Sequence, residues 1–325
     1  VGMELPEHLE RQRRHVRVGE HTVSQGAGFS ASGAFASMGV ANALDLDGFR
    51  AGLEVEVQAH RVERNSAGEA AESTLVFDLK GADVALANAL RRTLLAEVPS
   101  MAVERVFVHN NTSVVQDEVL AHRLGMLPIR ADPRAFRFPA AYDLETRALD
   151  AVPAPDAAEA LVFRLRAARA AGTGAGAATV YSSQLEWVPL PGQEGMEAPR
   201  VVHPDIPLAK LAQGQALDVE LHVLKGTGAR HAKWSPVATA SYRLLPDVSF
   251  AARVEGAAAD ALAAACPMGV FDVEELPAGL RRARVAAPRE CTMCRECLRP
   301  PGWEERVVLE RVRDVFIFTI ESTGA

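Results

Sequence analysis

Four cysteines are the residues of this chain whose types and spacing are best suited to chemistry. Three of them fall in the run CTMCREC, at positions 291, 294 and 297, and Cys266 stands upstream, directly before a proline. A C-x-x-C-x-x-C run lets one tight loop place three thiolates around a single centre, and a remote Cys-Pro can supply the fourth ligand of an iron–sulfur site. The spacing therefore favours a [4Fe–4S] cluster held by Cys266, Cys291, Cys294 and Cys297.

Three alternatives to an iron–sulfur cluster remain open for these thiols. Four thiolates can hold zinc tetrahedrally, although zinc usually takes two separate C-x-x-C pairs, and the thiols can also stay reduced with no metal. Disulfides are disfavoured because the chain shows no secretion signal and thiols inside cells stay reduced. A bound metal would serve either as a structural staple or as the centre of an electron carrier.

The charge balance argues against a protein that binds nucleic acid by itself. The 325 residues include 42 acidic and 35 basic side chains, a net charge of −7, so no overall basic field attracts a phosphate backbone. No run of eighteen apolar residues occurs, and the charged N-terminal segment lacks the apolar stretch of a signal peptide. We therefore expect an intracellular protein that does not enter the membrane.

No catalytic motif accompanies the cysteines. His122 and His231 belong to no HExxH or similar local signature, and the stretch GTGAGA at 172–177 lacks the Lys-Ser/Thr pair of a phosphate-binding loop. We therefore expect a non-catalytic protein, with a ferredoxin-like iron–sulfur electron carrier as the rival that the cysteines alone suggest.

The elements that must position the cysteines follow mixed helix and strand patterns. Residues 1–47 combine charge clusters with Gly, Ser and Ala, fit neither period, and are predicted to be a flexible N-terminal arm. Residues 52–60 alternate, with Leu53, Val55 and Val57 on one face, and residues 73–81 repeat the pattern, so the two segments predict a β-hairpin. Further strands are predicted at 103–110, 161–167, 217–226 and 311–322. The fold class is α+β.

The segment DVALANALRRTLLAEVPS predicts an amphipathic helix of about four turns. Asp83 is a suitable N-cap, Leu86, Leu90 and Leu94 form an i, i+4 stripe, and Pro99 ends the helix. Its apolar residues cover more than one face of the helix. The extra face indicates a binding partner.

The same helix lies within a sequence that resembles a known family. ANALRRTLLAEVPS followed by VERVFVHNNTSVVQDEVLAHRLGMLPI resembles the alpha motif of RNA polymerase subunits. HAKWSPVATASYRLLP and VRDVFIFTIESTGA are most similar to the alpha-like subunits shared by nuclear RNA polymerases I and III. The resemblance covers residues 45–325.

This resemblance implies a non-catalytic assembly subunit of DNA-directed RNA polymerase. In the family, the subunit forms a heterodimer with a smaller alpha-like subunit, and the heterodimer is the platform for the two largest, catalytic subunits. DNA is then reached only indirectly, through the complex, and the expected location is the nucleus, both nucleolus and nucleoplasm. A zinc-stabilised adaptor outside transcription is an alternative that keeps the scaffold role.

The resemblance also implies how the chain is divided. An alpha-type dimerisation domain, a sheet with amphipathic helices, would comprise residues 48–105 and 301–325. A mainly β insert at 106–255 and a small ferredoxin-like cysteine module at 256–300 would interrupt it. Archaeal members carry an iron–sulfur cluster in this module, where the four cysteines fall here. Relatives continue past the position of Ala325 into a final helix, so part of the partner interface is expected outside this sequence. Within it, the interface is expected at Leu86, Asn88, Leu90, Arg91, Arg92, Leu94, Phe316 and Phe318.

Overall fold

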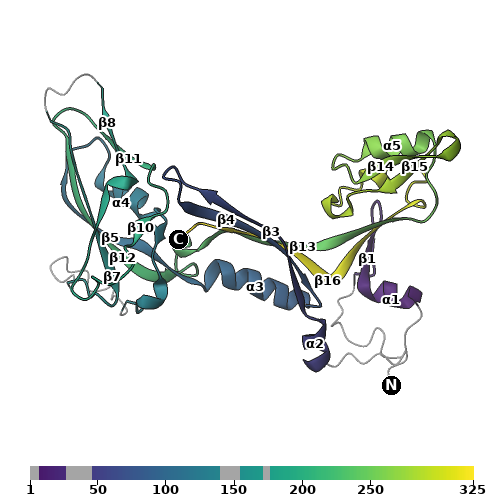
Figure 1. Cartoon of the computed structure of the whole chain (residues 1–325), viewed down its shortest axis with the longest axis horizontal. Helices are drawn as coiled ribbons and strands as arrows, with labels where there is room; N and C mark the ends of the chain where they lie inside the picture. The colour runs from purple at the N-terminus through teal and green to yellow at the C-terminus, as the bar shows by residue number, and fades with distance from the viewer. Residues whose placement is uncertain (1–6, 27–45, 140–153, 171–175) are drawn as a thin grey trace. The chain divides into compact units, whose positions relative to one another are not determined.

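A computed structural model of the chain describes residues 7–26, 46–139, 154–170 and 176–325, and it has the expected α+β architecture (Figure 1). The helices are α1 (Glu7–Arg14), α2 (Leu46–Gly52), α3 (Val84–Ala96), α4 (Asp117–Gly125) and α5 (Ala257–Ala265). No helix among these described residues is long and apolar enough to cross a membrane.

Strands make up most of the remaining regular structure. The first eight are β1 (His15–Val18), β2 (Val23–Ser24), β3 (Glu54–Arg64), β4 (Ala70–Lys80), β5 (Pro99–Asn111), β6 (Ile129–Arg130), β7 (Ala160–Ala168) and β8 (Ala178–Tyr181). The other eight are β9 (Leu185–Val188), β10 (Arg200–Val201), β11 (Pro207–Leu211), β12 (Ala216–Thr227), β13 (Val237–Phe250), β14 (Phe271–Leu276), β15 (Leu280–Val285) and β16 (Val307–Ser322). The strands predicted at 103–110, 161–167, 217–226 and 311–322 are present as β5, β7, β12 and β16.

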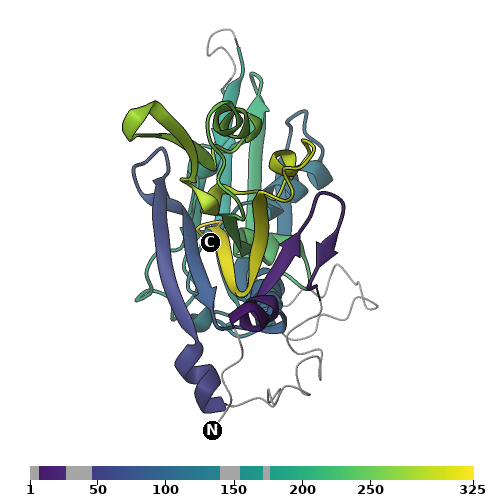
Figure 2. The same ribbon diagram turned by 90° about the vertical axis from the view of Figure 1, so that its right-hand side faces the viewer.

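The largest sheet joins segments from both ends of the chain. Its strand order is β2-β1-β16-β4-β3, with β13 also paired to β16. The predicted hairpin is confirmed as β3 and β4, two long strands joined by a tight turn (Figure 2). The turn forms because the Asn65 side chain accepts hydrogen bonds from the backbone N–H groups of Ala67 and Glu69, while Gly68 takes a positive φ of 79°.

A second sheet, in the order β5-β12-β7-β9, carries the principal core of the predicted insert. One face of β12 supplies Leu217, Val219, Leu221 and Val223, each at most 2 % exposed. Helix α4 covers this face with Leu120 and Leu124. The alternating pattern seen in the sequence is thus a sheet with one sealed face.

The described residues divide into two compact units. The first takes described residues from 1–58, 77–88 and 242–318, and the second from 59–76, 89–241 and 319–325. Residues 106–241 of the predicted insert fall in the second unit, whereas residues 242–255 fall in the first. The predicted cysteine module at 256–300 is not separate from the sheet strands of the first unit, because Val18 of β1 and Leu309 of β16 belong to the same hydrophobic core as α5, β14 and the cysteine loop.

The prediction of a flexible arm over residues 1–47 is wrong for residues 7–26. They form α1, β1 and β2, and β1 pairs antiparallel with β16 from His15–Val312 to Val18–Leu309. The strand that pairs with this segment lies near residue 310, far away in the sequence. The segment itself is short and charged and has no sustained alternating pattern, so its sequence does not indicate the strand pairing. Residues 1–6 and 27–45 of the predicted arm lie outside the described residues.

Candidate functional site

Helix α3 is the predicted amphipathic helix, and most of its apolar surface is uncovered. Asp83 caps it by accepting a 2.8 Å hydrogen bond from the backbone N–H of Ala85. Ala87 is the only buried residue of the helix, whereas Leu86 is 50 % and Leu90 is 37 % exposed. Moving a fully exposed leucine side chain into an apolar contact stabilises the complex by about 1.5–3 kcal/mol. The exposed leucines of the helix can therefore contribute substantially to binding an apolar surface.

Strand β3 and the residue before it present a second uncovered surface, which we call the β3 face and define as Leu53, Val55 and Val57. Val55 is 58 % and Val57 is 60 % exposed. On the opposite side of the strand, Glu56 accepts a hydrogen bond from Lys80 at 2.7 Å. The alternation of β3 is as predicted, but here the polar side chains contact the adjoining strand and the apolar ones have no cover.

The residues just before the HAKWSP motif contact the C-terminal end of α3. Gly228 approaches this end so closely that a Cβ there would lie 2.0 Å from the carbonyl oxygen of Leu95, and the next residue, Ala229, donates a backbone hydrogen bond to Ala96. Trp234 of the motif is buried and donates its indole N–H to the carbonyl of Leu224 at 2.9 Å. Gly228 and Ala229 therefore contact the end of the helix, and Trp234 packs the segment that follows them against β12.

The structure separates the predicted interface residues into two groups. Leu86, Leu90 and Arg92 are exposed, and Asn88, Arg91 and Leu94 are partly exposed. Phe316 and Phe318 are 0 % exposed, so their prediction as surface contacts needs correction. The ring of Phe318 stacks on Phe77 with centroids 5.0 Å apart, and Tyr242 packs against both phenylalanines. Other strands of the sheet thus enclose these two side chains in the core.

The four cysteines line one small cavity of about 10 Å³ in the first unit. Cys291 and Cys297 are buried, Cys266 is partly buried and Cys294 is exposed, and none forms a disulfide. Helix α5 ends at Cys266, and 3₁₀ turns at Pro288–Glu290 and Glu296–Leu298 carry the loop past the other three. Segments distant in sequence thus bring all four thiols to one place.

The geometry of this loop fits a metal centre. Met293 and Arg295 both have positive φ, at 61° and 69°, a conformation that non-glycine residues adopt at a cost of about 1–2 kcal/mol each. The backbone N–H of Val270 donates to the Cys266 sulfur at 3.4 Å, and that of Met293 donates to the Cys291 sulfur. Such N–H···S bonds support thiolates that bind metal.

Burial and mutual repulsion make the thiols of this site hard to ionise without a cation. Burial raises the pKa of Cys297 to about 12, and burial likewise raises the pKa of Cys291. Four adjacent thiolates would repel one another in this apolar setting, so without a cation the protonated forms prevail. A metal ion or cluster would supply the compensating charge. The cavity has the volume of about one water molecule, a size that suits a single ion, whereas the cysteine spacing suits a cluster.

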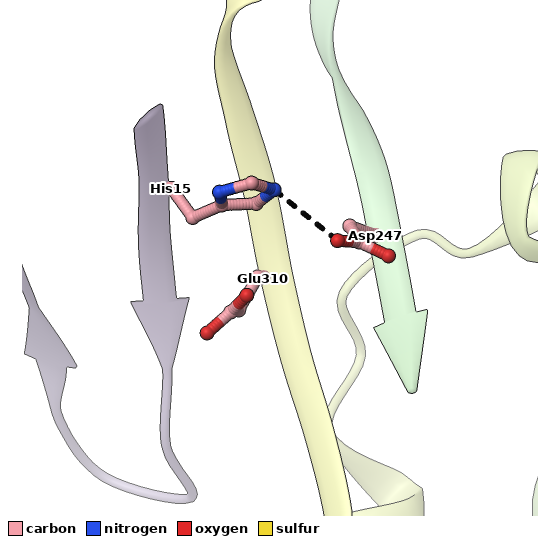
Figure 3. Close-up of side chains that lie close together, drawn as sticks. All are labelled: His15, Asp247 and Glu310. Carbon is pink, nitrogen blue, oxygen red and sulfur yellow. Dashed lines mark ion pairs between the residues drawn. The ribbon is translucent and has the colours of Figure 1, made fainter. Parts of the chain in front are cut away.

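A second group of possible metal ligands joins three strands of the first unit (Figure 3). His15 lies 3.2 Å from Asp247, and one ligand atom of each of His15, Asp247 and Glu310 lies within 4.8 Å of the others. Arg11 already donates to the buried Glu310 at 2.9 Å. The guanidinium balances these carboxylates, so the cluster fastens α1 to β16. Sequence reasoning missed it because the partners lie some 300 positions apart, with no local signal.

An apolar helix that is mostly exposed is suited to binding a partner, and comparison with known proteins identifies the family to which the chain belongs. Residues 76–325 match the model of the RNA polymerase Rpb3/Rpb11 dimerisation domain. The chain belongs to this family of RNA polymerase subunits.

Individual relatives narrow the comparison. The chain is 41 % identical over 325 residues to "DNA-directed RNA polymerases I and III subunit rpac1" of Dictyostelium discoideum, covering 98 % of this chain and 87 % of that protein. It is 46 % identical over 269 residues to the human subunit RPAC1 of RNA polymerases I and III, covering 78 % of this chain and 74 % of the relative. Identity to the RNA polymerase II subunit rpb3 of Dictyostelium discoideum is lower, 28 % over 264 residues, covering 79 % of this chain and 84 % of that protein.

Proposed function

We propose that this chain is the non-catalytic alpha-like subunit shared by RNA polymerases I and III, and that it works as an assembly platform in the nucleus. The observation that carries the proposal is α3, an apolar helix in which only Ala87 is buried. Dimerisation is the property for which its family is described, and the relatives named for polymerases I and III align over most of the chain.

The partner that best fits α3 is a smaller alpha-like subunit with an equivalent apolar helix. Leu86 and Leu90 are spaced i, i+4 and therefore stand one above the other on the helix, as the contacts of a helix packed against another helix do. In this proposal the heterodimer then receives the two largest subunits, and DNA is contacted only through the assembled complex. The location follows as nucleolus and nucleoplasm.

Purification of a tagged chain from its own cells tests this proposal. We expect a small alpha-like subunit and two very large subunits to co-purify, and we expect the variant Leu86→Asp/Leu90→Asp to lose them while remaining folded. Recovery of the wild-type chain without any polymerase subunit would exclude the assembly role. The alternative of a ferredoxin-like electron carrier receives no support from the comparisons.

The proposal assigns a structural metal centre to Cys266, Cys291, Cys294 and Cys297. When bound, the metal would cross-link α5 to the cysteine loop and add its binding free energy to folding. An iron–sulfur cluster is favoured by the C-x-x-C-x-x-C spacing, and zinc is the second candidate because of the 10 Å³ cavity. Metal analysis after anaerobic purification decides between about four iron and one zinc per chain. Isolation of the protein without metal would exclude both the iron–sulfur cluster and the zinc site.

A further inference from the structure

A partly buried ion pair connects the cysteine loop to the sheet that carries the β3 face. Arg289, two residues before Cys291, donates two parallel hydrogen bonds to the carboxylate of Asp78 on β4, at 2.6 and 2.7 Å. Asp78 is only 4 % exposed. A paired, bidentate contact of this kind is the strongest form of Arg–carboxylate interaction, and a buried carboxylate left alone is costly. We call this pair the Arg289–Asp78 clamp.

Two further side chains extend the clamp across the sheet. Gln58 of β3 donates to Asp78 at 3.0 Å, and Arg243 of β13 donates to the backbone carbonyl of Arg289 at 2.7 Å. The hydrogen bonds that Arg289 donates to Asp78 raise the pKa of Arg289, whereas burial and then the nearby charge of Arg289 lower the pKa of Arg243. Gln58 directly follows Val57, so the network reaches the strand whose outer side is the β3 face.

The cysteine loop makes a second outward contact through a repeated sequence. The triplet Arg-Glu-Cys occurs twice, at 289–291 and at 295–297. In both copies the cysteine lines the cavity and the arginine binds another element, since Arg295 donates to the carbonyl of Glu20 in the hairpin of β1 and β2 at 3.1 Å. Each arginine therefore ties the loop to another element, and Arg295 also lines the cavity.

We propose that Asp78 is a positioning residue of the cysteine site, because its clamp with Arg289 couples the cysteine loop to the β3–β4 hairpin. If the small alpha-like subunit that binds α3 also covers the β3 face, it restrains β3, Gln58 and Asp78 and protects the thiols of the loop. The coupling is reciprocal, since a well-ordered cysteine loop holds the hairpin in its partner-binding position. This second half rests on the proposed heterodimer, whereas the role of Asp78 does not.

The rate at which iodoacetamide alkylates Cys291 in the full-length chain tests the clamp, with or without metal in the site. Asp78→Asn keeps the shape of the side chain and removes its charge, and we expect alkylation of Cys291 to become between about 5-fold and 150-fold faster. The matched control is Asp272→Asn, which breaks the exposed pair of Asp272 with Arg284 in the same unit and leaves the rate unchanged. Hydrogen exchange of the buried residues 315–318 of β16, which belong to the same unit as the loop, must stay as slow as in the wild type, which separates loosening of the loop from unfolding.

A second variant tests the clamp if Asp78→Asn does not fold. Asp78→Asn/Arg289→Gln removes both charges. Iodoacetamide should alkylate Cys291 in this double variant at the same rate as in either single variant, because the two residues act as one unit. An unchanged alkylation rate in a folded variant would overturn the clamp.

The partner arm of the experiment adds the small alpha-like subunit from the same organism. We expect it to slow alkylation of Cys291 in the wild-type chain and to have a smaller effect in Asp78→Asn. Binding with no change in the wild-type rate would overturn the reciprocal half of the proposal. Absence of any binding would instead contradict the proposed function, and the comparison of Asp78→Asn with Asp272→Asn would still decide the clamp.

Discussion

Helices α3 and α4 both carry an apolar leucine stripe, yet one is bare and the other is sealed. In α4, Leu120 and Leu124 are 0 % exposed and belong to the core that includes Met101 and Val103. In α3, Leu86 is half exposed and Ala87 alone is buried. An apolar stripe thus shows which face of a helix needs cover, but not whether the same chain provides it. The difference marks α4 as part of the fold and α3 as part of an assembly.

The largest expected effect on stability comes from the sealed helix. Leu120→Ala leaves a cavity in the core and should lower the free energy of unfolding by about 2–5 kcal/mol. Leu86→Ala, the matched change on α3, should alter it by less than about 0.5 kcal/mol in the isolated chain. Urea unfolding of the two variants measures both values, and equal losses would break the distinction between the helices.

A comparable effect is expected on partner binding when the bare helix is changed. Leu86→Asp/Leu90→Asp places charges on a surface that the partner would bury, and should weaken binding by at least about 2 kcal/mol, or about 30-fold. Titration calorimetry with the small alpha-like subunit measures this loss. Glu118→Gln on α4 serves as the control, and wild-type affinity in the double variant would show that α3 is not the contact.

A smaller effect should follow when the contact at the end of α3 is disturbed. Gly228→Ala places a methyl group against the Leu95 carbonyl and should destabilise the second unit by about 1–3 kcal/mol. Gly195→Ala is the control, because a Cβ at Gly195 meets no atom within 4 Å. Proteolysis by trypsin at Arg92 reports on the helix itself, and cleavage should be faster in Gly228→Ala only. Equal cleavage of both variants would show that the contact of Gly228 with Leu95 does not stabilise α3.

The smallest effect concerns an exposed carboxyl group near α4. Hydrogen bonds from the Arg134 side chain and backbone hold the pKa of Asp132 at about 2, below its ordinary value of 3.8. Because the folded pKa is depressed, this contribution is present above the ordinary value and is lost as the pH falls towards 2. Asp132→Asn should therefore make the midpoint of thermal unfolding slightly less dependent on pH between about pH 4 and pH 2. An identical pH profile would show that the pair is immaterial.

Local sequence patterns were enough to predict the structural features that depend on residues close together in the sequence. The boundaries of α3 follow from Asp83 and Pro99, and its surplus apolar surface is visible in its leucines. The interior position of Phe316 and Phe318 could not be inferred, because β16 is apolar on both faces and the covering rings, Phe77 and Tyr242, come from other strands. An interface strand and a central strand have the same sequence pattern.

Long-range polar pairs account for the rest. The fastening of α1 depends on Arg11 and Glu310, and the cysteine loop depends on Asp78 meeting Arg289. Each partner alone resembles an ordinary surface charge, and only the folded sheet brings them together. The four cysteines were predicted as one set because their spacing is itself a local signal, and the structure places them around one cavity.

Hydrogen exchange of the chain with and without the small alpha-like subunit tests the central claim most directly. If α3 is the partner surface, binding should slow exchange in residues 84–96 and 54–64 and leave α4, already sealed, unchanged. Slower exchange confined to other segments, with α3 as fast in the complex as in the free chain, would contradict the claim that this bare helix is where the polymerase subunits join.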